Sequence, residues 1–290
     1  MNIHRRLATV GAGAVVAVAA VVPLGPAPAS ADPAGLVTVG FTTAANSSDK
    51  TYSKACPPGT VVTGGGGYLT ANPAAQGWVG LDQLEPNADG SGFTATLREV
   101  DTYAGNWSLT VKAQCADPLP GWQRLSATSA AATTSATATT PSCPAGKSVI
   151  GTGAKVNNGQ GEVVLDDVIP SANLKTVTAK AYRVPGSAHS GWTLTAYAIC
   201  ANTPAGLQLV SWDTGPLTST AHQSLNWHCD ESAGPKGTFG GGFAIDSGLG
   251  NVLPSVLNVY SSDDMSAAAD EFHSGYAGNW NLTLYVICGS

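Results

Sequence analysis

Lysine and arginine are scarce in this sequence, with 13 among 290 residues against 19 aspartates and glutamates. Nucleic acids and anionic membranes are bound through clusters of basic side chains, so this imbalance argues against both as partners. Charged residues of either sign make up only 11% of the chain. Beyond residue 31, no apolar run is long enough to span a bilayer. We therefore expect neither a nucleic-acid-binding protein nor a membrane protein.

Familiar motifs of metal and covalent chemistry are also missing. The sequence has no C-x-x-C pair, which often begins a zinc site, and no G-x-S-x-G turn, which presents a nucleophilic serine. Strand-like sequence, not a helix with a lysine in register, follows the glycines of residues 64–67, which argues against a phosphate loop. We predict no cofactor and no metal. An acidic patch that could hold Ca²⁺ is the alternative, although its spacing fits no calcium loop: Asp263, Asp264, Asp270 and Glu271.

The N-terminus has the pattern of an export signal. Arg5 and Arg6 precede an apolar run over residues 7–24, and small residues at 29–31 form a cleavage site. Prolines interrupt the run, which argues against a membrane anchor. We predict a signal peptide over residues 1–31 and a secreted, extracellular chain that no membrane retains after cleavage. That mature chain carries 11 basic and 19 acidic side chains, a net charge of −8.

Six cysteines, an even number, favour disulfides over metal ligands in an exported chain. They form three pairs separated by 59, 57 and 59 residues, and corresponding cysteines recur every 85 to 88 residues. This period predicts three repeats that fill the mature chain, at residues 32–116, 117–201 and 202–290. Pairing within each repeat is the simplest of 15 possible connectivities. The predicted disulfides are Cys56–Cys115, Cys143–Cys200 and Cys229–Cys288.

Each repeat closes with the same pattern, W-x-L-T-x-x-x-x-C, which begins at Trp107, Trp192 and Trp280. Alternate residues of a strand share a face, so the tryptophan, several aliphatic side chains and the cysteine are buried together. About six strand-like segments occur in each repeat, spaced as in sandwiches and barrels. The predicted fold is all-β, with three tandem antiparallel sandwich-like repeats of roughly 86 residues, each holding one disulfide. The alternative is one three-fold, β-prism-like body in which strands cross between repeats.

Histidines and paired carboxylates are the side chains that could serve catalysis. His189 and His273 each precede a Ser-Gly pair before the closing strand, which predicts equivalent loops. The first repeat has no counterpart and the rest of a Ser-His-Asp arrangement is not visible, so solvated loop histidines are favoured. Asp82 and Asp166 fall at matching positions of two repeats. We expect both to face outward, where carboxylates limit pairing at a sheet edge.

The repeats allow each aromatic side chain to be compared with its counterparts. Positions that carry a charge in a sister repeat are expected to be exposed, and sugars or partner proteins dock against exposed aromatics. The predicted binding residues, each given with its charged counterpart, are Trp78 with Glu162, Tyr68 with Lys155, and Trp227 with Lys54. The alternative for each is a solitary apolar side chain on the surface, which needs no function. Trp122 and Trp212 align with apolar residues, and we predict that both lie in the core.

The two motifs C-P-x-G-x-x-V-x-G-G-G and W-x-L-T-x-x-x-x-C-A resemble a repeat of small exported bacterial proteins, especially of the actinobacterial type. The resemblance covers the whole mature chain, and the second copy matches best, at residues 143–146 and 196–201. The third copy departs from it at Asp230, which follows the opening cysteine directly. That family has no established activity, so the resemblance implies export and a β-rich fold but no site. A looser likeness, through glycine-rich Cys-to-Cys units, links the chain to the three-fold β-prism proteins of the egg vitelline outer layer.

A secreted, non-catalytic binding or surface protein is the function that these observations favour. Three similar units without a shared polar constellation suit multivalent attachment, in which weak sites add through effective concentration. Low charge and exposed aromatics make a glycan or cell-wall polymer the expected partner. One competing hypothesis is a secreted hydrolase with a cleft between repeats, which would have to combine His189 or His273 with carboxylates. Another is an inhibitor or effector that binds a single protein target.

Overall fold

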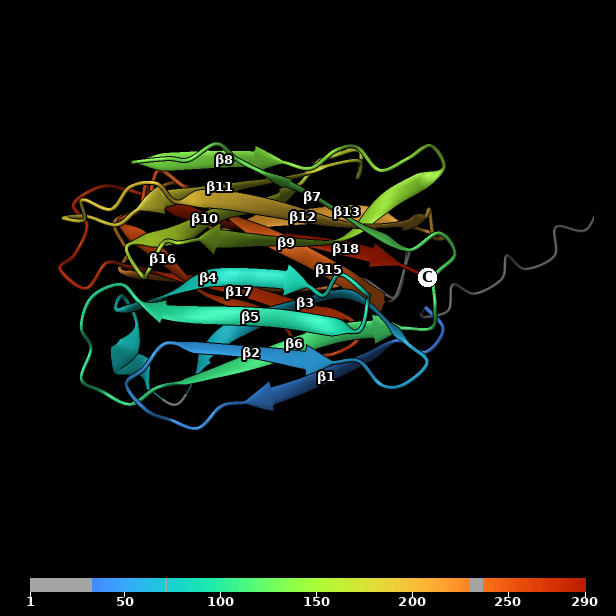
Figure 1. Ribbon diagram of the computed structural model, residues 1–290, viewed down its shortest axis with the longest axis horizontal. Helices are drawn as coiled ribbons and strands as arrows, with labels where there is room; N and C mark the ends of the chain where they lie inside the picture. Colours follow the sequence, from blue (N-terminus) through green and yellow to red (C-terminus); the bar gives the residue numbers. More distant parts are fainter. Residues whose placement is uncertain (1–32, 71, 230–236) are drawn as a thin grey trace, which may run out of the picture.

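The computed structural model describes residues 33–70, 72–229 and 237–290. Within these residues, eighteen strands form three six-stranded antiparallel sheets, which confirms the predicted all-β class (Figure 1). Valine, threonine and aromatic residues recur in the strands, as expected for pleated and half-buried surfaces. The predicted signal peptide over residues 1–31 lies outside the described residues.

Each repeat supplies six strands in the same order. The first has β1 (Val37–Thr42), β2 (Lys50–Ala55), β3 (Val61–Thr70), β4 (Val79–Pro86), β5 (Gly92–Glu99) and β6 (Ser108–Ala116), with a 3-10 turn, η1 (Pro73–Ala75), before β4. The second has β7 (Gln123–Thr128), β8 (Ser135–Thr139), β9 (Lys147–Asn157), β10 (Val163–Pro170), β11 (Val177–Arg183) and β12 (Thr193–Asn202). The third has β13 (Gln208–Asp213), β14 (His222–His228), β15 (Gly237–Asp246), β16 (Val252–Val259), β17 (Asp264–Glu271) and β18 (Asn281–Gly289).

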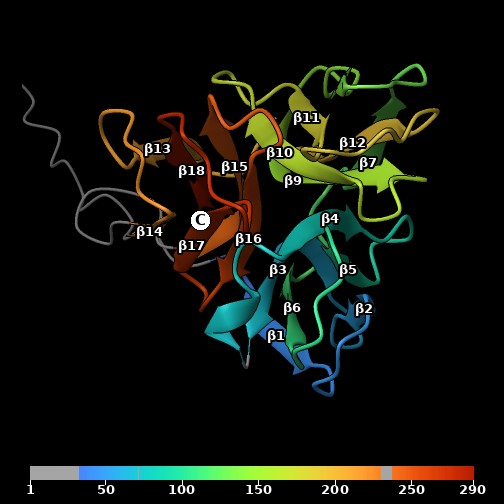
Figure 2. The same ribbon diagram turned by 90° about the vertical axis from the view of Figure 1, so that its left-hand side faces the viewer.

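The strands of each repeat are divided between two sheets. Within a repeat, the first, sixth and third strands lie side by side, as do the second, fifth and fourth. β4 pairs with β9, β10 with β15, and β16 with β3, so every sheet joins halves of two repeats. Figure 2 looks along the strands and shows the three repeats arranged around a common axis. Each repeat is thus a sandwich-like pair of half-sheets within one three-fold, prism-like body.

Glycines allow the three repeats to meet at the axis of this prism. A Cβ built on Gly240 of β15 would lie 3.2 Å from the Cα of Gly64 and 3.3 Å from the Cα of Gly151. A Cβ on Gly151 would overlap the carbonyl oxygen of Thr63 in the first repeat. Close approach of backbones therefore explains the glycine-rich strand in each repeat.

The closing strands bury the face that their motif predicts. Trp107, Trp192 and Trp280 are fully buried within one core cluster that extends through all three repeats. The cysteine eight residues after each tryptophan forms the predicted disulfide inside its own repeat, with a Cα–Cα distance of 5.8 Å in all three. The disulfides lie near the C-terminal ends of the closing strands, and the tryptophans lie at the opposite end of the prism.

Some predicted side-chain placements are wrong. Trp212, expected in the core, is 53% exposed, because β13 is the outermost strand of its sheet. Asp82 and Asp166, expected to face solvent, are buried, because β4 and β10 are interior strands that pair with the next repeat. Each of these aspartates is the extra residue of a β-bulge. Trp122 packs partly buried against the core and donates from Nε1 to the carbonyl oxygen of Val62.

Candidate functional site

Three equivalent junctions between repeats lie at the tryptophan end of the prism, and two of them hold clefts. At each junction, a glycine with positive φ lies two residues before the fourth strand of one repeat. It approaches a backbone carbonyl at the end of the fifth strand of the neighbouring repeat. A side chain at these positions would be strained and would overlap that carbonyl. The three contacts are Gly161 with Glu99, Gly250 with Arg183, and Gly77 with Glu271. A small apolar cluster closes this end of the axis: Val100, Val164, Val184, Leu253 and Phe272.

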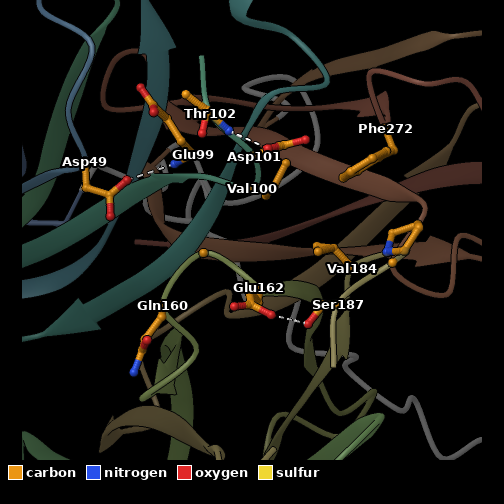
Figure 3. Close-up of a pocket in the computed structure, with 13 residues that line it drawn as sticks. Asp49, Glu99, Val100, Asp101, Thr102, Gln160, Glu162, Val184, Ser187 and Phe272 are labelled. Atoms are coloured by element: carbon orange, nitrogen blue, oxygen red, sulfur yellow. Dashed lines mark hydrogen bonds between the residues drawn. The ribbon is translucent and has the colours of Figure 1, made fainter. Parts of the chain in front are cut away.

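The cleft between the first and second repeats has a volume of about 690 Å³, and it is acidic (Figure 3). Its lining includes four carboxylates and the side chain of Phe272: the acidic residues are Asp49, Glu99, Asp101 and Glu162. Carboxylates accept hydrogen bonds from hydroxyl and ammonium groups, so this cleft suits a neutral polyol or a cation better than an anion.

Three of these carboxylates are held by other side chains. Oδ2 of Asp49 accepts a 2.7 Å hydrogen bond from Nη1 of Arg98. Oε1 of Glu99 accepts a 2.8 Å hydrogen bond from Nε1 of Trp107, and Oε2 of Glu162 accepts a 2.5 Å bond from the hydroxyl of Ser187. Ser187 therefore donates to a carboxylate and is not paired with a histidine base that could activate it. Among the described residues that line the cleft there is no histidine. His273 approaches it only through Asp101, with Nε2 at 3.5 Å from Oδ2.

The cleft between the second and third repeats, about 290 Å³, has a different charge. Arg183 takes the place of Glu99, because it pairs with Val163 as Glu99 pairs with Val79. Asn251 takes the place of Glu162, and a proline stands where Asp101 lies in the first repeat. The same backbone frame therefore presents a guanidinium here and carboxylates in the neighbouring cleft.

The junction between the third and first repeats is filled by aromatic rings. Trp78, one of the predicted binding residues, stacks on His273 with ring centroids 3.7 Å apart and an angle of 8°. Tyr103 packs against the other part of the indole at 5.6 Å. Trp78 accepts a backbone hydrogen bond from Val100 as Glu162 does from Val184, which confirms the predicted alignment of Trp78 with Glu162. The indole is half-buried, so most of its surface serves this junction.

Aromatic pairs with one exposed and one half-buried ring occupy the outer rim of two repeats. In the third repeat, Trp212 on β13 stacks on Trp227 on β14, with centroids 4.9 Å apart and an angle of 19°. In the first repeat, Phe41 on β1 and Tyr52 on β2 stack at 4.1 Å and 17°. Phe41 is 43% exposed and Trp212 is 53% exposed. In the second repeat, Ala127 stands opposite Ala196 at the position that Phe41 and Trp212 hold.

The structure does not bring the three predicted binding residues together, and all three are half-buried where exposure was predicted. Trp78 lies at a junction, Trp227 at the outer rim, and Tyr68 on β3 opposite Val256. Sequence comparison found Trp227 but missed Trp212 as its stacking partner. Both residues belong to the first two strands of a repeat, and these strands are outermost in their sheets. This position in the repeat was the signal that could have indicated exposure of Trp212.

A serine, an aspartate and a histidine do meet in the third repeat, in an order that does not activate the serine. Ser255 donates a 2.5 Å hydrogen bond to Oδ2 of buried Asp270, whose Oδ1 lies 2.6 Å from Nδ1 of His222. The bond to Asp270 raises the pKa of His222. Because the aspartate stands between the other two, the hydroxyl has no base to receive its proton. His189 and His273 are not equivalent, since His189 hydrogen-bonds the carbonyl of Asn158.

Among the described residues, burial raises the pKa of three carboxyl groups, which lie on β4 and β10. Burial raises the pKa of Asp82 to about 6, against the opposing effect of Arg98, whose Nε lies 3.2 Å from Oδ2. Burial, with the neighbouring charge of Asp167, raises the pKa of Asp166 well above its ordinary value. The pKa of Asp167 is also raised by burial, although Lys180 opposes the shift.

The acidic patch near the C-terminus is not arranged as a calcium loop. Asp270 is engaged by Ser255 and His222, and Glu271 accepts from Nε1 of Trp280 at 3.3 Å. In the part of the chain that the structure describes, no three acidic, histidine or cysteine side chains are grouped so that they could hold a metal ion.

Comparison with protein-family models and with curated proteins found no match for this chain. The described residues contain no helix long and apolar enough to cross a membrane. The three disulfides are compatible with an extracellular protein.

Proposed function

We propose that this is a secreted, non-catalytic binding protein that attaches to a glycan or cell-wall polymer through two aromatic pairs at its outer rim, in each of which one ring is exposed. The observation that carries the proposal is the stacked pair of Trp212 and Trp227 on two outermost strands. Flat aromatic surfaces with polar neighbours stack against sugar rings, and exposed polar side chains flank the pair at Asp213, Asn226 and His228. The pair of Phe41 and Tyr52 offers a second such surface.

A purely structural role for these rings explains less. The rings stand where the two half-sheets of a repeat open to solvent, so they could serve only to close that rim. The second repeat forms the same strands with Ala127 at this position and Ala138 on β8, and therefore closes its rim without aromatics. Two pairs on one rigid body would add their weak affinities through effective concentration.

Export is part of the proposal and has separate support. Residues 1–31 have the sequence of a signal peptide, the motifs resemble those of exported bacterial repeat proteins, and the three disulfides fit an oxidising compartment. The low content of basic residues argues against nucleic acid as the partner.

A hydrolase with its site in the acidic cleft is the alternative. The carboxylates that line this cleft favour it, but two features argue against a nucleophilic site there. Ser187 donates its hydroxyl hydrogen to Glu162, and no histidine is among the described residues that line the cleft. Binding is therefore the better-supported function.

Retention on insoluble polymers tests the proposal. The oxidised mature protein should be retained by at least one of peptidoglycan, chitin and cellulose, or by intact bacterial cells. Removing one stacking ring with Trp212→Ala should weaken binding to that polymer by about 5- to 30-fold, as expected for a loss of about 1–2 kcal/mol at a binding hot spot. Tyr260→Ala is the matched control, because Tyr260 is 56% exposed and belongs to neither pair. The proposal fails if the wild type is retained by none of these, or if the two variants bind equally.

A further inference from the structure

The closing tryptophans need a hydrogen-bond acceptor because their rings are fully buried. A buried indole N–H is normally paired, since burial without a partner is costly. In the first repeat Nε1 of Trp107 donates to Oε1 of Glu99 at 2.8 Å, and in the third Nε1 of Trp280 donates to Oε1 of Glu271 at 3.3 Å. Both repeats thus place a carboxylate against the buried indole.

The second repeat has the donor without this acceptor. Register puts Arg183 at the equivalent position, because it pairs with Val163 as Glu271 pairs with Val252. Nε1 of Trp192 is buried and has no hydrogen-bond partner among the described residues. The second repeat therefore keeps the indole donor, but it has an arginine at the position where the sister repeats have a glutamate.

In the first and third repeats, a backbone N–H group also faces the carboxylate that accepts the hydrogen bond of the indole. The backbone N–H groups of Tyr103 and Tyr276 face Oε2 of Glu99 and Glu271, at 3.5 and 3.3 Å. In the same loop of the second repeat, the backbone N–H of His189 donates to the hydroxyl of Ser187 at 3.0 Å. The indole of Trp192 is thus the member of this set that remains unpaired.

Arg183 lines the cleft between the second and third repeats, together with Thr134, Tyr182 and Asn251. The fully buried indole of Trp192 is not part of this lining, just as Trp107 is not part of the lining from which Glu99 reaches it in the first repeat. The Arg183 guanidinium makes no hydrogen bond or ion pair with any carboxylate in the described part of the chain, whereas Arg98 pairs with Asp49 and Asp82, and Arg124 pairs with Glu85. A half-buried guanidinium at a cleft is suited to bidentate binding of a carboxylate.

We propose that this cleft binds the carboxylate of a small acidic ligand, such as a sugar acid. Arg183 pairs with the carboxylate, and one of its oxygens accepts the hydrogen bond of Trp192 Nε1. The ligand carboxylate then occupies the place that the side chains of Glu99 and Glu271 occupy in the sister repeats. A planar carboxylate is favoured over a tetrahedral oxyanion because both sister positions are built around a planar group.

Nuclear magnetic resonance of the indole N–H groups tests this directly. The resonance of Trp192 is assigned with Trp192→Phe, and sodium acetate is the probe. We expect the Trp192 N–H resonance to move downfield and saturate, while those of Trp107 and Trp280 stay in place because their acceptors are internal. These two resonances also report that each variant is folded.

Variants separate binding from nonspecific effects. Arg183→Glu should move the Trp192 resonance without acetate and abolish its response, because the new carboxylate fills the position. Arg183→Ala should weaken the response, whereas Lys54→Glu, a charge reversal on β2, should leave it unchanged. The proposal is overturned if acetate leaves Trp192 unmoved, if Arg183→Glu responds as the wild type does, or if phosphate acts as strongly as acetate.

Discussion

Gly151→Ala should destabilise the protein strongly, because it places a methyl group where two repeats touch. The added Cβ would overlap the carbonyl oxygen of Thr63 on β3 and lie 3.0 Å from Cδ1 of Ile199. Overpacking of a core costs about 1–3 kcal/mol when side chains can move. Here the atom in the way belongs to the backbone of an interior strand, so we expect a loss of about 3 kcal/mol or more in the free energy of unfolding.

Denaturation by guanidinium chloride, with the disulfides intact, measures this loss through linear extrapolation. Gly40→Ala on β1 is the control, because its Cβ would meet only the flexible end of the Lys112 side chain. Gly240→Ala should fall between the two, since its nearest neighbours would lie at 3.2–3.4 Å. If Gly151→Ala unfolds at the same denaturant concentration as Gly40→Ala, the close contact at the axis is not present.

Other substitutions test the buried carboxyls and the disulfides. A folded-state pKa above the ordinary 3.8 means that the charged form of Asp166 destabilises the fold as pH rises through that range. Asp166→Asn should therefore raise the free energy of unfolding at neutral pH, and the gain should vanish at pH values below 3.8; a loss at neutral pH would contradict the assigned burial and repulsion by Asp167. Replacing Cys143 and Cys200 by alanine opens a loop of 57 residues and should cost about 4 kcal/mol in the same denaturation assay, and a cost well under 1 kcal/mol would refute the role given to the disulfide.

The regular spacing of the cysteines and the alternation of apolar residues along the strands made the architecture of a single repeat predictable. Spacing of the cysteines defined three units, and counting in twos from Trp107, Trp192 and Trp280 placed the buried faces correctly. The same pattern cannot say which strands of different repeats become neighbours. β16 and β3 pair through only two residue positions, Val256 with Tyr68 and Leu257 with Gly67, and backbone pairing of this kind leaves no side-chain signature.

Comparison between repeats predicted some side-chain environments and failed for others. Trp212 was assigned to the core because its counterpart Phe41 is apolar, but Phe41 is itself 43% exposed, so an apolar counterpart does not imply burial. The sequence suggested that Asp82 and Asp166 lie at a sheet edge. In the structure both are buried, because each lies at a bulge of a strand that pairs with the next repeat. The clefts could not be predicted because they combine residues far apart in the sequence, such as Glu99, Glu162 and Phe272, whose proximity depends on the closed three-fold arrangement.

Differential scanning calorimetry of the oxidised mature protein tests most directly whether the three repeats form one body with clefts between them. A single cooperative unit gives a calorimetric enthalpy equal to the van't Hoff enthalpy. Shared sheets, the glycine axis and a continuous core predict one transition with a ratio of about 1 between these enthalpies. A ratio of about 3, as expected for three repeats that unfold independently, would contradict the account.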